Sequence, residues 1–175
     1  MGFLKLNGLI QGELAGGKSR EDIFQELSGK SPTDVAKFAY CIASIPRKSL
    51  RAKYLKVNGV LFLLLLILAA LSLLSELPID MQQSTLFIAI SIVVPLVFSY
   101  FIYQFYGAVY RLLGIWCLID LVESLLLLQF TTAIDLVKLF VLVAVTILSF
   151  LIAVKVFPNM KLLGPKLGPD GNYLL

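Results

Sequence analysis

The strongest constraint on this chain is the stretch Met81–Tyr110, thirty residues in which no side chain carries a charge. A bilayer core about 30 Å thick is crossed by about 20 apolar helical residues, so this stretch can hold one span, at about residues 84–106. Three further apolar stretches predict spans at about residues 57–77, 110–130 and 134–157. The links between the four spans are short, which makes consecutive helices antiparallel neighbours.

The composition agrees with a membrane protein. Hydrophobic residues make up 59% of the chain and charged residues 15%, against about 45–50% and about 25% in soluble domains. We therefore predict an all-α integral membrane protein with four antiparallel transmembrane helices in residues 57–158. A small, basic cytoplasmic helical module in residues 1–56 precedes them, and a Gly/Pro-containing cytoplasmic tail in residues 159–175 follows them.

The positions of Lys and Arg predict the orientation, because short cytoplasmic segments of membrane proteins are enriched in these residues. The predicted links at residues 76–83 and 129–133 contain neither. The link between the second and third spans is followed by Arg111, and Lys155, Lys161 and Lys166 lie around the end of the fourth span. We predict that both termini are cytoplasmic and that the protein lies in the cell (inner) membrane. Four tyrosines lie near the second link: Tyr100, Tyr103, Tyr106 and Tyr110. We interpret them as an interfacial belt rather than an aromatic ligand pocket.

The first 56 residues show several helix signals. Apolar residues at helical spacing predict a helix over residues 3–15, and Ser19 is a cap for a second helix that stops near Gly29. Ser31 and the proline after it begin a third helix, and a last basic helix at about residues 47–56 runs toward the first span. Five basic side chains lie beside that span: Arg47, Lys48, Arg51, Lys53 and Lys56. We expect them to contact anionic lipid headgroups rather than nucleic acid.

One segment of the module, Gly12–Ser19, matches the phosphate-binding pattern G-x-x-x-x-G-K-S. Such a loop needs a preceding buried strand and a parallel sheet, but the preceding residues have helical periodicity. We therefore interpret Gly16 and Gly17 as a helix break and Ser19 as a cap, and expect no nucleotide site. The chain contains no histidine, and its two cysteines, Cys41 and Cys117, belong to no metal-binding pattern. We expect no catalytic triad, no metal and no cofactor.

The charged residues inside the predicted spans are the best candidates for a functional site. Asp120 and Glu123, at spacing i, i+3, are expected on one face of the third span. Lys138 in the fourth span lies at a depth that lets its side chain reach Glu123. An intramembrane polar cluster is therefore predicted from Asp120, Glu123, Lys138, Ser72, Ser75 and Glu76. It can fix helix packing or bind a partner's membrane helix, or it can line a proton or cation path; a shifted third span is a further interpretation.

These features favour a non-catalytic polytopic membrane protein that acts through protein–protein interaction, as an accessory subunit, assembly factor, sensor or immunity-type protein. Its expected partners are the lipid bilayer and either another membrane protein or further copies of itself. The alternative is a small oligomeric proton- or cation-coupled carrier or channel that uses Asp120 and Glu123. A membrane enzyme is a weaker hypothesis, since it would have to work with two carboxylates and no histidine.

Overall fold

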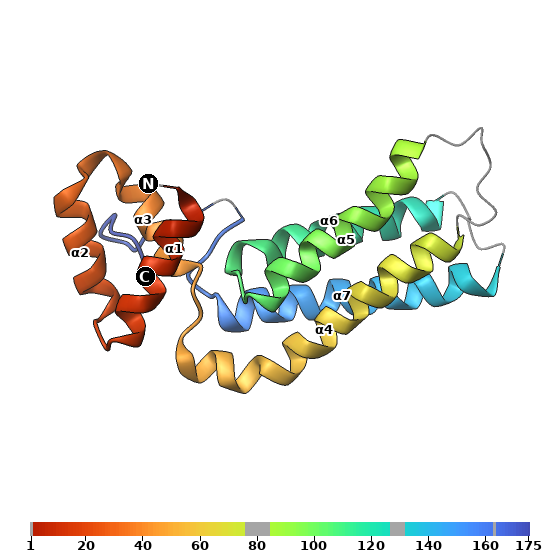
Figure 1. Ribbon diagram of the computed structural model, residues 1–175, viewed down its shortest axis with the longest axis horizontal. Coiled ribbons are helices and arrows are strands. Elements are labelled where there is room, and N and C mark those ends of the chain that lie inside the picture. The colour runs from red at the N-terminus through yellow and green to blue at the C-terminus, as the bar shows by residue number, and fades with distance from the viewer. Residues whose placement is uncertain (1, 76–84, 127–131, 163) are drawn as a thin grey trace.

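The structure is a computed structural model that describes residues 2–75, 85–126, 132–162 and 164–175. Within these ranges the chain is helical and contains no β-strand. Three helices and a short 3-10 turn form one end of the molecule, and four longer helices form an elongated bundle (Figure 1). Both ends of the described chain lie in the smaller part (Figure 1).

The N-terminal module consists of α1 (Phe3–Ala15), α2 (Arg20–Lys30), η1 (Pro32–Asp34) and α3 (Val35–Ala43). These bounds confirm the helices predicted from periodicity and caps. The hydroxyl of Ser19 accepts a hydrogen bond from the backbone N–H of Asp22, which stabilises the start of α2. A small core of its own, where the three helices meet, contains Leu6, Ile10, Ile23, Phe38, Cys41, Ile42 and Ile45.

The bundle consists of α4 (Lys48–Ser75), α5 (Thr85–Tyr103), α6 (Gly107–Leu126) and α7 (Ala133–Val156). The basic helix predicted at residues 47–56 is the first part of α4, so it continues into the apolar segment without a break. Thr132 and Asp135 form a reciprocal capping box at the start of α7, with distances of 3.2 and 2.9 Å. Among the described residues, two helices, α4 and α7, are long and apolar enough to cross a membrane.

The link between α5 and α6 lies three residues earlier than predicted, at residues 104–106 rather than 107–109. Phe105 ends α5 in the left-handed conformation, with φ of 58°. Its N–H bonds to Ile102 O at 2.9 Å, and the N–H of Tyr106 bonds to Phe101 O at 3.1 Å, which together make a Schellman motif. Glycine usually occupies this position, so a Phe there gives no sequence signal that the helix ends.

The helices of the bundle do not pack in chain order. The central pair is α4 and α7; α5 packs on α4, and α6 packs on α7. Consecutive α5 and α6 contact each other only sparsely, unlike the neighbours expected from their short link. The shared core includes Leu61 and Leu65 of α4 and Val145 and Ile152 of α7, all with no exposed surface.

The tail after α7 folds back onto the module. The ring of Tyr173 packs edge-on against Phe24 of α2 at 6.1 Å between centroids. Asn159 donates its side-chain amide to the carbonyl of Leu175 at 3.1 Å, and Leu175 packs against the module core. The tail therefore joins the bundle to the module.

Candidate functional site

The charged residues of α6 face different surroundings. Asp120 is half-buried, and its carboxylate interacts with the positive charge of Lys138 of α7 and with the negative charge of Glu123. Glu123 is exposed, and no ion pair within 4 Å joins it to Lys138. Residues three apart on a helix are separated by about 60° around the axis, which here is enough to leave Asp120 half-buried and Glu123 exposed. The structure therefore contains no ion pair between Glu123 and Lys138, and their energetic coupling stays a prediction.

The surroundings of Glu123 are otherwise apolar. It lies in a shallow groove of about 450 Å³ on the outer face of α6, lined also by Leu118, Ile119, Val122 and Leu126. These four side chains are between 43% and 76% exposed. Helical spacing explains the groove, since positions 118, 119, 122, 123 and 126 follow one face of a helix.

The contribution of α4 to the predicted polar cluster rests on three residues. Ser72 is buried on α4. The side chain of Ser75 and all of Glu76 lie outside the described residues. Their part in the cluster stays a prediction.

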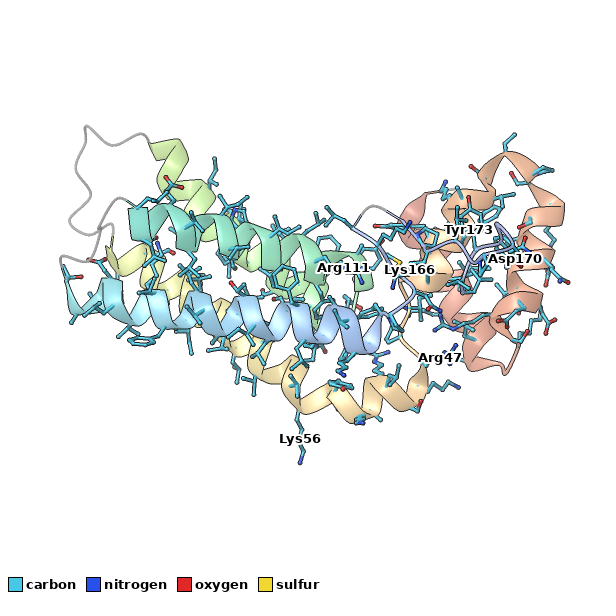
Figure 2. The ribbon with its side chains drawn as sticks, turned by 180° about the vertical axis from the view of Figure 1, so that it is seen from behind. Arg47, Lys56, Arg111, Lys166, Asp170 and Tyr173 are labelled. Atoms are coloured by element: carbon cyan, nitrogen blue, oxygen red, sulfur yellow. The ribbon has the colours of Figure 1, made fainter. Side chains whose placement is uncertain are left out.

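The basic cluster predicted beside the first span lies on the linker and the first turns of α4. All five side chains, Arg47, Lys48, Arg51, Lys53 and Lys56, are on exposed residues. Arg51 stacks over the ring of Phe105 at 5.4 Å, and so covers the residue that holds the left-handed backbone conformation. The side chain of Lys56 points away from the bundle, whereas Arg47 lies next to the module (Figure 2).

The module and the bundle meet at a junction that we call the waist, formed by residues 44–47, 104–107 and 157–160. The N–H of Gly107 donates to Ser44 O at 3.0 Å. A Cβ on Gly107 would lie 2.5 Å from the ring of Phe157, so only glycine fits there. Arg111 donates to the carbonyls of Met160 and Phe157 and holds the start of the tail (Figure 2).

A buried hydrogen-bond network adjoins the waist. The hydroxyl of Tyr110 donates to Asn58 Oδ1 at 2.5 Å, and Asn58 Nδ2 donates to Ile102 O at 2.9 Å. Tyr110 also stacks on Phe157, with 5.4 Å between ring centroids. It has no exposed surface, so its assignment to an interfacial belt was wrong, whereas Tyr103 is 67% exposed. Asn58, an amide in an apolar span, was the signal that could have revealed this network.

A cavity of about 240 Å³ lies beside the waist, between the module and the ends of α4 and α7. Two arginines, Arg20 of α2 and Arg47, line it. The guanidinium of Arg20 donates to Ile42 O at 3.0 Å and to Ile45 O at 2.6 Å. Burial lowers the pKa of Arg20, and the positive charge of Arg47 lowers it further. No local sequence pattern links these two arginines, which lie on different segments of the chain.

The G-x-x-x-x-G-K-S segment forms a helix–turn–helix, as interpreted. It begins within α1, and Gly17 in the following turn has φ of 93°. Lys18 pairs with Glu13 at 2.7 Å and with Glu26 at 3.0 Å. The lysine ammonium is thus held by two carboxylates of the module. In the described ranges, no three His, Cys, Asp or Glu side chains gather closely enough to hold a metal ion.

Comparison with known proteins yields no family model, curated protein or solved structure that matches this chain. The functional evidence is the geometry of three surfaces. They are the Glu123 groove, the basic cluster and the cavity lined by Arg20 and Arg47.

Proposed function

We propose that this protein is a non-catalytic membrane subunit whose helices α4–α7 all cross the bilayer, and which binds another membrane protein through the Glu123 groove. Accessory subunits, assembly factors, sensors and immunity-type proteins belong to this class. Both termini are then cytoplasmic, since every cluster of Lys and Arg lies at the module end of the bundle.

The exposed side chains support four spans. Large apolar residues are exposed on each helix of the bundle, including Leu63 of α4, Val93 of α5, Ile119 of α6 and Phe140 of α7, at 52–72%. Only 33% of the most apolar window of α4 or α7 is buried in the protein. Apolar faces this extensive are unfavourable in water and favourable against lipid chains.

The observation that carries the partner proposal is the exposure of Glu123 among apolar side chains. Glu123 lies in the last described turn of α6, toward the predicted outer end of its span, and a charge inside an apolar segment is costly unless it is paired or reaches water. Ionisable residues inside membranes normally face the bundle interior or pair with another group. Among the described residues, Glu123 neither faces the interior of the bundle nor forms an ion pair. A membrane helix from another protein, with a Lys or Arg at this depth, would cover the groove and neutralise the carboxylate.

A proton or cation carrier is the alternative. Such a path would need Asp120 and Glu123 to share one polar surface. Of the two, only Asp120 is half-buried, under the charges of both Lys138 and Glu123, while Glu123 opens to the outside of the bundle. A partner helix therefore fits the geometry better than a path through one copy.

Site-specific photocross-linking tests this proposal in native membranes. A photoreactive residue at Ile119, inside the groove, should give an adduct with a second polypeptide, and Glu123→Leu in the same chain should abolish it. The matched control is the same probe at Val154, an exposed apolar position on α7, which should give only lipid adducts. An adduct with the mass of two copies would indicate self-association instead. Proton uptake into vesicles that is lost in Glu123→Gln would favour the carrier.

A further inference from the structure

The cavity at the waist combines two positive charges with an apolar wall. Arg20 and Arg47 line one part of it, and Leu50, Val156 and Phe157 line another. No Asp or Glu side chain is among its described lining residues, which also include Leu175, whose backbone oxygen accepts a hydrogen bond from Asn159. The two guanidinium groups repel each other, and an anion between them would remove this repulsion.

The two arginines have different roles. Each terminal nitrogen of Arg20 donates one hydrogen bond, to the carbonyl of Ile42 or of Ile45, so Arg20 supplies positive charge from a fixed position. Arg47 lies on the linker between α3 and α4 and is exposed. Its planar guanidinium can therefore bind two oxygens of a phosphate group at once.

The cavity also lies at the right depth for a lipid headgroup if α4 and α7 span the membrane. It is lined by residues from the last turn of α7, where that apolar segment ends, and from the basic first turn of α4, about two turns before its apolar segment begins. Its volume of about 240 Å³ is below the roughly 300–1,000 Å³ of pockets that enclose a whole drug-sized ligand. This is enough for a phosphate headgroup, with the acyl chains remaining in the bilayer.

We propose that this cavity binds the phosphate group of an anionic phospholipid, with Arg47 as the direct ligand, Arg20 as the fixed second charge and Leu50 and Val156 against the glycerol end of the lipid. This site differs from the Glu123 groove, and it rests only on the membrane placement of the proposed function. Bound lipid would hold the module against the bundle at the membrane surface.

The test uses the full chain in neutral detergent, titrated with phosphatidylglycerol or phosphatidylcholine, with the thermal unfolding midpoint as the readout. Phosphatidylglycerol should raise the midpoint and phosphatidylcholine should not, because a ligand that binds the folded state stabilises it. Arg47→Gln should weaken the phosphatidylglycerol effect about tenfold, through the loss of one charge-assisted contact. Arg47→Lys should retain part of it.

The matched control is Lys56→Gln, which removes the same charge from α4 at a side chain that points away from the bundle (Figure 2). As one of the basic residues expected at the membrane surface, Lys56 should contribute only diffuse attraction, so this variant should weaken the phosphatidylglycerol effect much less than Arg47→Gln does. Equal losses in Arg47→Gln and Lys56→Gln would overturn the proposal in favour of diffuse charge attraction. An Arg47-dependent effect of inorganic phosphate alone, with none from lipid, would overturn the lipid as the source of the phosphate. Failure of the chain to float with vesicles, in wild type and variants alike, would instead contradict the membrane placement.

Discussion

The hydrogen bond between Tyr110 and Asn58 can be removed with little other change. Tyr110→Phe deletes the hydroxyl that donates to Asn58 Oδ1 at 2.5 Å, and keeps the ring that stacks on Phe157. Asn58 is only 4% exposed, so water cannot easily replace the lost donor. A buried polar atom left without its partner costs about 1–3 kcal/mol.

The two single variants should differ in how much they destabilise the protein. Asn58→Leu leaves the Tyr110 hydroxyl, which lies 3.5 Å from Ile102 O and can still donate to it. Ile102 O also keeps the N–H of Phe105 at 2.9 Å. Asn58→Leu should therefore be less destabilising than Tyr110→Phe. The double variant should be about as stable as Asn58→Leu, because the donor on Tyr110 and the acceptor on Asn58 are then removed together and neither is left unpaired.

Thermal unfolding in detergent can measure these effects with a thiol-reactive dye. The free cysteines Cys41 and Cys117 are both buried and react only on unfolding. Burial also raises the pKa of the Cys41 thiol to about 11, which suppresses its reaction in the folded state. At about 2–4 °C per kcal/mol for a chain of this size, Tyr110→Phe should lower the midpoint by roughly 2–12 °C. An unchanged midpoint, or losses that add in the double variant, would refute this explanation.

Three further predictions concern other parts of the chain. Cysteine labelling in intact cells should reach Thr132 from outside and the exposed position Gln104, in the link between α5 and α6, only after permeabilisation; cytoplasmic labelling of Thr132 would contradict the four-span topology. Gly107→Val should destabilise the protein by about 1–3 kcal/mol, since the new side chain collides with the buried Phe157 ring; an unchanged unfolding midpoint would show that the ring moves freely. Hydrogen bonds from Lys30 and Lys18 lower the pKa of Glu26 from 4.5 to about 2, so its stabilising effect is complete above about pH 4.5 and is lost as the pH falls toward 2; circular dichroism should show a smaller acid-induced loss of stability in Glu26→Gln, and identical acid titrations of both proteins would count against this pairing.

Much of the helical structure followed from local patterns. The Ser19 cap, the proline restart near residue 32 and the apolar periodicity of residues 3–15 involve neighbours a few positions apart. The Phe105 turn was misplaced because a bulky residue holds a conformation that usually needs glycine. Packing around Phe105, including Arg51 over its ring, decides that conformation.

The sequence by itself determined that the chain is helical, where most helices begin and end, and where its charges fall. The tertiary structure decided that α4 pairs with α7, that Tyr110 is buried, and that Asp120 is half-buried while Glu123 is exposed. The physical reason is the range of the interactions. Caps and periodicity act within one or two turns, whereas Tyr110 and Asn58 are 52 positions apart, and Arg20 and Arg47 line one cavity only because the tail and the linker close it.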